Sequence, residues 1–159
     1  MTDEQKKKYP FLDADTDDDS MTPSNGQTSD EATEEDTELF FENDDTGEQL
    51  RYQDADALDN AGFGVIKVDD EGIVEFFNKW ESELSGVKKS EAEGRNFFTQ
   101  VAPCTNNRLF RGRFKKGVRR GELDETFTYT YTYKMRPTLV EVHMYRDEEG
   151  NNWIMVQKF

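Results

Sequence analysis

The sequence predicts an α+β domain with a five-stranded antiparallel sheet, flanking helices, an N-terminal cap and an acidic arm. Two observations indicate the fold class: two short β-rich runs precede a set of helical segments, and three longer β-rich runs close the chain. A third observation, the uneven distribution of charge, separates the folded part from the arm.

The acidity of the chain is confined to its N-terminal part. Residues 1–60 contain 4 Lys/Arg and 20 Asp/Glu, a net charge of −16, whereas residues 61–159 contain 16 and 15, a net charge of +1. Few apolar residues occur before position 38, so we predict that residues 1–36 are a disordered acidic arm. Isolated apolar residues over 37–62 predict a cap of short helices that lie on another surface. Residues 63–159 are of the size of one domain.

The strands are recognised by their β-branched and aromatic residues. Residues 64–68 and 72–77 are separated by the acidic run 69–71, which is typical of a hairpin. Near the C-terminus, aromatic residues and threonine alternate without interruption over seven positions, as expected of a strand with one buried face. Turns containing proline or glycine separate the last three strands, which we place at 127–133, 139–145 and 153–157.

Helices are predicted between the hairpin and the last three strands. Two short helices, 78–85 and 90–93, end at Gly86 and Gly94. Residues 105–107 offer capping side chains for a longer helix that runs to about Arg120. We expect one face of that helix to be apolar, formed by Leu109, Phe110, Phe114 and Val118.

Cys104 is the single cysteine of the chain, so no disulfide can form within it. No apolar stretch follows the N-terminal lysines, and no run approaches the roughly 18 apolar residues of a membrane span. These patterns predict a protein of the reducing cytoplasm that does not cross a membrane. Cys104 is then expected to be a free thiol or a covalent attachment point.

Several motifs together resemble one family. They are NFFTQVAPCT at 96–105, FRGRF at 110–114, GVRRGEL at 117–123, YTYTYKMRPT at 129–138 and VHM at 142–144. With these motifs the chain resembles the photoactive yellow proteins, bacterial blue-light receptors with a PAS domain, from about residue 39 to residue 159. The resemblance implies a PAS fold and a role in sensory transduction rather than catalysis. It does not extend to the arm.

The resemblance also implies a cofactor, p-coumaric acid (4-hydroxycinnamic acid), bound to Cys104 as a thioester. The chemistry is consistent with the residue, because a thiolate must accept the acyl group and a helix start after Cys104 would favour a thiolate. Pro103 would hold the cysteine in one direction. Without the resemblance, a lone cysteine is more often a small buried apolar residue.

Glu81 matches a protonated glutamic acid that donates a hydrogen bond to the buried phenolate of the chromophore in this family. Desolvation and a nearby negative charge both raise the pKa of such a carboxyl, which keeps it neutral. Ser85 matches a hydroxyl that supports the same network. By its neighbours Lys79 and Glu83 alone, Glu81 would instead be an exposed helix residue.

Two residues depart from the family pattern. Phe77 stands where the family has a tyrosine that donates to the phenolate, and Val87 stands where the best-known member has an arginine that covers the pocket. Without the tyrosine we expect the chromophore to titrate closer to neutral pH. The rest of the expected pocket matches the family, and its residues are Ile66, Phe97, Val101, Ala102, Pro103, Thr105, Tyr131, Tyr133, Met135 and Val156.

The implied mechanism is a trans/cis isomerisation driven by blue light, followed by proton transfer from Glu81. The resulting buried carboxylate costs several kcal/mol, comparable with the stability of a small domain, so the cap is expected to loosen. We expect a monomer that signals to a partner protein of unknown identity.

Three alternatives remain open at this point. A PAS domain without chromophore could serve as a protein-interaction module. A thiol enzyme could pair Cys104 with His143 and Glu141. The basic segment 108–120 could bind nucleic acid, although we expect a solvated helix face that attracts the acidic arm only weakly. No phosphate-binding loop or Cys/His metal motif is present in the sequence.

Overall fold

The computed structural model describes residues 39–41, 45–132 and 136–159. The described residues belong to one compact unit, Leu39–Phe159. The predicted arm at 1–36 lies outside the described residues, and so do two expected pocket residues, Tyr133 and Met135.

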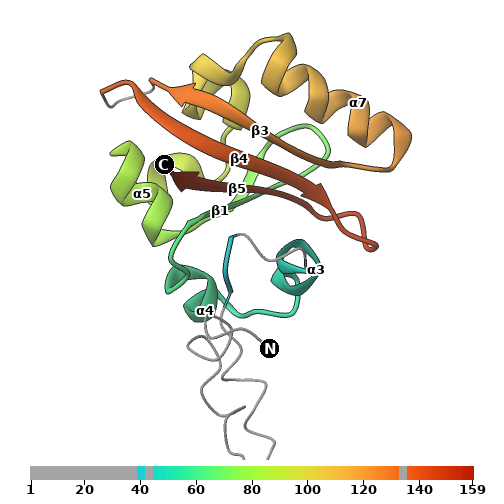
Figure 1. Ribbon diagram of the computed structural model, residues 1–159, viewed down its shortest axis with the longest axis horizontal. Helices are drawn as coiled ribbons and strands as arrows, with labels where there is room; N and C mark the ends of the chain where they lie inside the picture. Colours follow the sequence, from blue (N-terminus) through green and yellow to red (C-terminus); the bar gives the residue numbers. More distant parts are fainter. Residues whose placement is uncertain (1–38, 42–44, 133–135) are drawn as a thin grey trace, which may run out of the picture. The chain divides into compact units, whose positions relative to one another are not determined.

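The fold is built on a five-stranded antiparallel sheet, as predicted. The strands are arranged in the order β2-β1-β5-β4-β3, so β5 is central and β2 and β3 form the edges (Figure 1). Their bounds are Gly64–Val68 for β1, Val74–Phe77 for β2, Asp124–Tyr131 for β3, Thr138–Arg146 for β4 and Asn152–Lys158 for β5.

Two strands start two or more residues away from their predicted positions. β3 begins three residues earlier, because Asp124 pairs with Tyr145 before the aromatic alternation starts. β2 begins two residues later, because Ile73 instead forms an isolated bridge to Asn96. In the turn between β1 and β2, the carboxylate of Asp69 accepts hydrogen bonds from the backbone of Glu71 and Ile73, each at 2.9 Å. This acidic turn therefore supplies its own hydrogen-bond acceptors.

One face of the sheet, called the inner face here, is covered by six short helical elements. They are α5 (Lys79–Ser85), α6 (Lys89–Ala92), η3 (Phe97–Val101), η4 (Pro103–Thr105), η5 (Arg108–Gly112) and α7 (Arg113–Arg120). In Figure 1, α5 and α7 lie over opposite ends of the sheet. The two short helices predicted before Phe97 are present, each within about one residue of its predicted position.

The single long helix predicted up to Arg120 is wrong in its first half. A π-helical turn, η5, precedes α7, and its wider backbone changes which side chains share a face. Phe110 and Phe114 are buried as expected, but Leu109 is 48% exposed. Leu109 therefore does not belong to the apolar face.

Strand alternation divides the apolar side chains between two cores. Ile66 on β1 and Val156 on β5 point to the inner face and join the larger core under the helices. Val65 and Met155 on the same strands point to the outer face and join a smaller core. Central strands with two covered faces are buried along nearly their whole length, which is why β5 shows a continuous apolar run.

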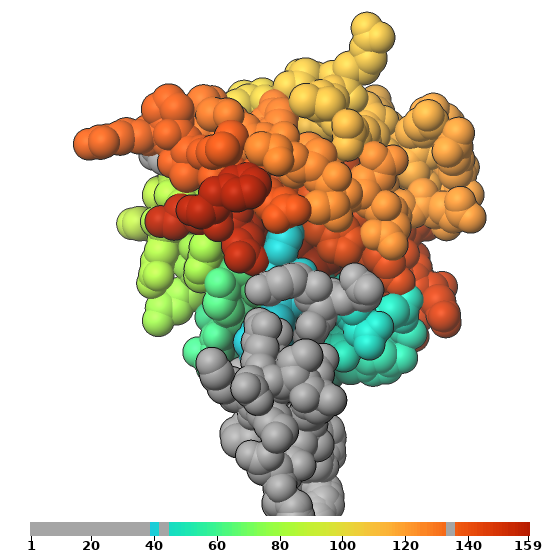
Figure 2. Space-filling view, in the orientation of Figure 1, coloured from blue at the N-terminus to red at the C-terminus, as the bar shows by residue number. Residues whose placement is uncertain are grey.

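The cap forms the cover of the smaller core. It contains α3 (Thr46–Leu50) and α4 (Ala55–Asp59), which pack through Leu50 and Leu58 against the outer face. Figure 2 shows the teal cap segments below the orange and red strands of the sheet. Two short helices, α3 and α4, thus lie on the sheet within the range 37–62. In the part of the chain that is described, no helix is both long and apolar enough to cross a membrane.

Candidate functional site

Cys104 lies in the 3₁₀ turn η4, half-buried against the inner core. Its backbone carbonyl accepts hydrogen bonds from the hydroxyl of Tyr129 at 2.5 Å and from the side-chain amide of Asn107 at 3.2 Å. Thr105 closes the same turn by donating its hydroxyl to the carbonyl of Ala102 at 2.7 Å. The backbone around the thiol is therefore held from strand β3 and from within the loop.

Cys104 is not placed directly at a helix start. The helical segment begins after Asn107, whose side chain accepts the hydrogen bond from the backbone of Phe110 at 2.9 Å. Cys104 instead belongs to a separate turn before that cap. The predicted helix start after Cys104 is therefore confirmed at Asn107, while its effect on the thiolate stays a prediction; the backbone of Cys104 is fixed by its own turn and by Tyr129.

Glu81 is fully buried in the first turn of α5. Its backbone N–H donates to the side-chain oxygen of Asn78 at 3.0 Å, and its carbonyl accepts from the hydroxyl of Ser85 at 2.8 Å. Lys79 and Glu83 on the same helix are exposed. The exposed-helix reading of Glu81 is wrong, because the turn of the helix directs Glu81 and Ser85 inward.

Most of the expected pocket residues are brought together in the inner core. The expected site residues that belong to this one apolar cluster are Ile66, Phe77, Phe97, Val101, Ala102, Tyr131 and Val156, and Cys104 packs against it. Thr105 is also fully buried, whereas Pro103 is exposed. The cluster combines a thiol at its edge with an apolar interior.

The two residues that depart from the family pattern also lie in this core. Phe77 is fully buried and pairs with Ile66 across β1 and β2. Val87 is 4% exposed and belongs to the core rather than to the surface. The hydroxyl of Ser85 already donates to the Glu81 carbonyl, and it accepts from the backbone N–H of Val87 at 3.2 Å.

Asn78 connects the Glu81 helix to the cap, and sequence reasoning did not single it out. Its side-chain oxygen accepts from the backbone of Glu81 and of Val65, both at 3.0 Å. Its side-chain nitrogen donates to the carbonyl of Leu58 in α4 at 2.8 Å and to that of Phe63 at 3.0 Å. An asparagine just before a helical pattern is a typical N-cap signal, but its link to the cap depends on the tertiary structure.

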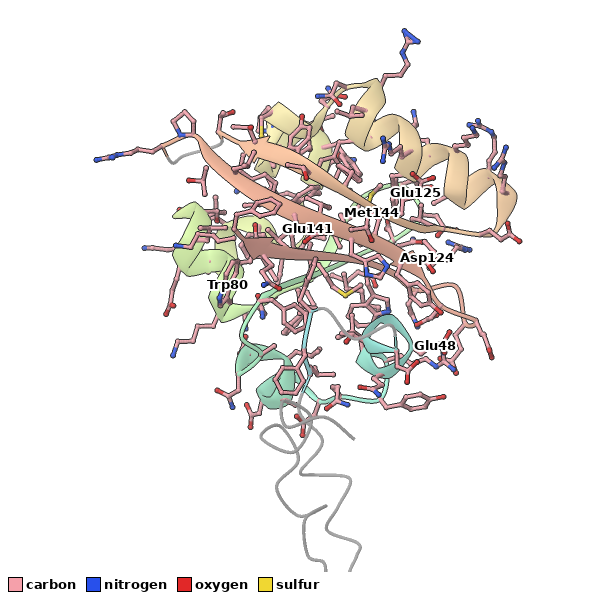
Figure 3. All side chains as sticks on the ribbon, in the orientation of Figure 1. Glu48, Trp80, Asp124, Glu125, Glu141 and Met144 are labelled. Atoms are coloured by element: carbon pink, nitrogen blue, oxygen red, sulfur yellow. The ribbon has the colours of Figure 1, made fainter. Side chains whose placement is uncertain are left out.

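His143 lies on the outer face of the sheet, away from Cys104. It alternates along β4 with Val142 and Met144, which belong to the inner core on which Cys104 packs. Its ring packs edge-on against Phe41 of the cap, and its Nε2 lies 2.7 Å from a carboxylate oxygen of Asp124. Figure 3 labels Asp124 on β3 beside this strand. The Cys–His–Glu arrangement of a thiol enzyme is therefore excluded.

The basic segment before β3 is partly engaged in contacts within the domain. The guanidinium of Arg113 lies 4.5 Å from the ring centroid of Phe127 and 3.3 Å from a carboxylate oxygen of Glu125. Lys115, Lys116 and Arg119 are exposed. The aromatic residues of the segment face the core, so they do not form a surface on which bases could stack.

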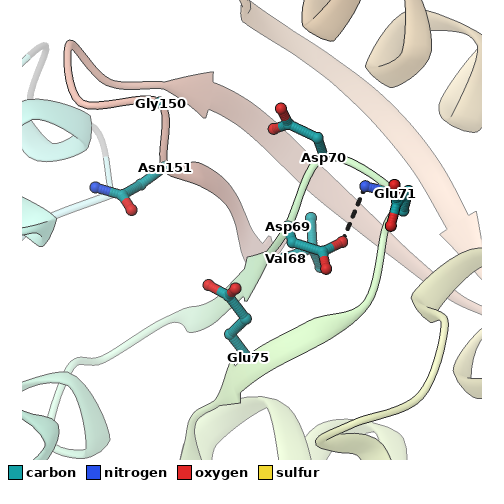
Figure 4. A pocket seen from close by; sticks show the side chains of 7 residues that line it. All are labelled: Val68, Asp69, Asp70, Glu71, Glu75, Gly150 and Asn151. Atoms are coloured by element: carbon teal, nitrogen blue, oxygen red, sulfur yellow. Dashed lines mark hydrogen bonds between the residues drawn. The ribbon is translucent and has the colours of Figure 1, made fainter.

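Two acidic hollows lie on the surface of the part of the chain that the structure describes. One, of about 330 Å³, is shown in Figure 4 and is lined by Val68, Asp69, Asp70, Glu71, Glu75, Gly150 and Asn151. The other, of about 460 Å³, lies between α3, the start of β3 and the turn after β4. Within the described residues no group of three His, Cys, Asp or Glu side chains could hold a metal ion.

Comparison with known proteins finds matches to the PAS fold and to photoactive yellow proteins. The family model described as PAS fold matches residues 52–158. Photoactive yellow protein from Halochromatium salexigens is 38% identical over 121 residues, which cover 76% of this chain and 97% of that protein. Photoactive yellow protein from Rhodothalassium salexigens is 41% identical over 102 residues, which cover 64% of this chain and 82% of that protein.

Solved structures agree with these relatives. The photoactive yellow protein domain from the sensor histidine kinase Ppr of Rhodospirillum centenum has a TM-score of 0.67 and 37% identity, and the match covers 70% of this chain and 99% of that domain. The PAS domain of the quorum-sensing receptor RpfR from Cronobacter turicensis has a TM-score of 0.53 and 19% identity, and the match covers 63% of this chain and 96% of that domain. The second match supports the fold alone.

Proposed function

This chain belongs to the PAS-fold proteins and, within them, to the photoactive yellow protein family, and from that premise we propose that it is a blue-light photoreceptor with p-coumaric acid bound to Cys104. One observation carries the proposal. The half-buried thiol of Cys104 packs against the inner apolar core, and the helix α5 on the same face of the sheet carries a fully buried glutamic acid, Glu81. A purely structural PAS core has no need of a buried carboxyl.

The residues present fit an aromatic acyl group. Cys104 would hold the group as a thioester, and the turn fixed by Tyr129 and Thr105 would orient the thiol. Phe97 and Tyr131 offer fully buried rings for packing against an aromatic ligand. In its protonated form, Glu81 would donate a hydrogen bond from a fully buried position. We expect Tyr133 and Met135, which match the family motif, to complete the site.

The bound group would supply a double bond that isomerises on absorbing blue light and a phenolate that gains proton affinity. In the dark state Glu81 holds its proton on a carboxyl oxygen inside the fold. When it gives up that proton, the carboxylate is left in an apolar interior at a cost of order several kcal/mol. The helix α5 must then move until water reaches Glu81, because the whole domain is stable by only about 5–15 kcal/mol.

The cap is the part that we expect to respond first. Asn78 caps the Glu81 helix and also binds the carbonyl of Leu58 in α4. Asp59, at the end of α4, accepts from the backbone of Lys79 at 2.9 Å and pairs with Lys89 at 3.0 Å. A shift of α5 therefore pulls directly on α4. The cap covers the smaller of the two cores, so it opens at lower cost than the sheet.

The output is signalling rather than catalysis. One solved relative is a domain of a sensor histidine kinase, so we propose that the loosened cap is recognised by a protein partner. We further propose that the photoreceptor works in the cytoplasm as a monomer, and that it does not engage nucleic acid. A PAS interaction module without chromophore is the alternative.

Reconstitution with activated p-coumaric acid tests the proposal. The wild-type protein should gain the mass of one coumaroyl group and a visible band that bleaches in blue light and returns in the dark. Cys104→Ala should stay folded and gain no mass, whereas Glu81→Gln should load normally with a shifted band. If Cys104→Ala still gained the mass of a coumaroyl group, the attachment site would be wrong. An absence of loading in the wild type would favour the alternative.

A further inference from the structure

Gly64 is the first residue of β1, at the place where the side chain of Glu81 meets the sheet. It pairs with Val156 on the neighbouring strand β5. A methyl group placed on Cα of Gly64 would overlap carboxyl oxygen Oε1 of Glu81. The carboxyl therefore occupies the space that a side chain on β1 would otherwise fill.

Backbone conformation does not require a glycine at this position. Gly64 is a strand residue and is not among the glycines with positive φ, which are Gly72, Gly86, Gly94, Gly121 and Gly150. A glycine within a strand usually weakens it, because it offers no side chain for packing and loses more entropy on folding. Space for a neighbour is the remaining reason for a glycine here.

The space at Gly64 is tight, but only the contact with Glu81 is an overlap. An added methyl group would lie 3.2 Å from Cε3 of Trp80 and 3.2 Å from Cβ of Val156. Figure 3 shows Trp80 on α5, next to the strands. At 3.2 Å these two neighbours would have to give by a few tenths of an ångström, whereas the carboxyl of Glu81 would have to leave its place.

The main chain of Glu81 is held at both ends, by Asn78 at its N–H and by Ser85 at its carbonyl. With the main chain of Glu81 fixed, the space left by Gly64 on strand β1 limits how far the carboxyl of Glu81 can extend into the fold. We propose that Gly64 is a positioning residue for the Glu81 carboxyl, and that its missing side chain sets the place from which the proton is donated. The consequence for light sensing rests on the proposed function, but the contact itself does not.

A double-mutant cycle in the protein without chromophore tests the contact. Gly64→Ala should lower the urea midpoint in the wild type and in Glu81→Gln, because glutamine has nearly the same shape as glutamic acid. In Glu81→Ala the same change should cause little or no loss, since the obstructing carboxyl is gone. Gly62→Ala is the matched control, because a methyl group there meets nothing within 4 Å.

Equal losses from Gly64→Ala in all three backgrounds would overturn the proposal, because the obstacle would then be Trp80, Val156 or the backbone. If Gly64→Ala alone does not fold, recovery of folding in the Gly64→Ala/Glu81→Ala double variant supports the proposal. Failure of the double variant to fold overturns it.

Infrared spectroscopy of the loaded protein tests the consequence. The carbonyl band of protonated Glu81, identified by its absence in Glu81→Gln, should shift in Gly64→Ala and stay unchanged in Gly62→Ala. The light-driven loss of that proton should slow by roughly 10- to 100-fold, the scale expected for a displacement of about 1 Å. An unchanged band in Gly64→Ala would overturn the positioning role. If no carbonyl band is lost in Glu81→Gln, the proposed function fails, while the cycle without chromophore still decides the contact.

Discussion

Arg51 at the end of α3 and Asp147 after β4 form an ion pair that joins the cap to the sheet, with 3.9 Å between Nη1 and Oδ2. Both side chains are largely hidden from solvent, at 10% and 0% exposure. Two further carboxylates of the same turn, Glu148 and Glu149, lie 3.9 Å from the guanidinium. The hydroxyl of Tyr145 on β4 also donates to Glu48 of α3. The cap is therefore attached by polar contacts in addition to its apolar core.

Replacing Arg51 should loosen the cap. In Arg51→Met the long apolar stem is kept, but the positive charge is lost. That charge faces four carboxylates, those of Glu48, Asp147, Glu148 and Glu149. We expect backbone amides of α3 and α4 to exchange with solvent several-fold faster, while the amides of β4 and β5 keep their protection. Hydrogen exchange followed by mass spectrometry measures this difference.

Arg119→Met is the matched control for that experiment, since Arg119 is an exposed arginine on α7. It should leave exchange in the cap unchanged. Unchanged exchange of α3 in Arg51→Met would show that the apolar core alone holds the cap.

Asp147 should make the stability of the fold sensitive to acid. Burial by itself would raise the pKa of its carboxyl, but hydrogen bonds from Trp153, Asn151 and the backbone of Glu149 lower that pKa below its ordinary value. The stability that these bonds provide is present above about pH 4, the unfolded pKa, and is lost as the pH falls through the lower folded pKa.

Asp147→Asn is expected to lower the free energy of unfolding by about 1–3 kcal/mol at pH 7, because the indole N–H of Trp153 is left without a charged acceptor. The difference from wild type should shrink as the pH falls below about 4. Urea titrations at several pH values measure it. Glu149→Gln, at an exposed position in the same turn, is the control. A difference that does not change with pH would mean that ionisation of Asp147 is not the cause.

Much of the fold follows from local sequence patterns. Alternating residues identify β3, because period-two alternation has no other common structural origin. The two ends of α5 also carry local signals. An asparagine, Asn78, caps its start, and a glycine, Gly86, follows its last residue. Leu109 is the exception, because its exposure could not be predicted from helical periodicity. It lies in a π-helical turn, which the sequence does not distinguish from an α-helix.

The site could be predicted only in part. Cys104 and Glu81 were identified through motifs, because neither residue type alone indicates burial or modification. The contacts that hold them come from distant segments, such as Tyr129 on the Cys104 carbonyl and Asn78 on Leu58. Partners 20 or 25 residues apart are decided by how the strands and helices pack, and a single sequence does not contain that information directly.

Asn78→Ser should separate the two functions of that side chain. Serine still caps α5 by accepting from the backbone of Glu81, but it lacks the nitrogen that donates to Leu58 and Phe63. We expect a loss of about 1–3 kcal/mol in the free energy of unfolding, because buried carbonyls lose their donor. Amide exchange in α4 should accelerate more than exchange in α5.

A matched control is Asp54→Ala, which removes the N-cap of α4 at the backbone of Ala57 without touching α5. In the loaded protein, Asn78→Ser should change the rate of dark recovery, whereas Asp54→Ala should change it less. Equal effects of the two variants on recovery would mean that cap stability, and not the link through Asn78, sets the rate.

Phe77→Tyr should restore a donor to the proposed phenolate. Without chromophore the new hydroxyl would be buried in the core, where the hydroxyl of Ser85 is already used by the Glu81 carbonyl, so the variant should lose about 1–3 kcal/mol of stability. After loading, the visible band should titrate at lower pH than in the wild type, because a hydrogen bond to the charged form favours that form.

Phe63→Tyr is the control, since Phe63 is buried in the smaller core on the outer face. It should destabilise the protein without moving the titration. If the midpoint in Phe77→Tyr equals that of the wild type, another group already supplies the second hydrogen bond and Phe77 does not explain the colour of the protein.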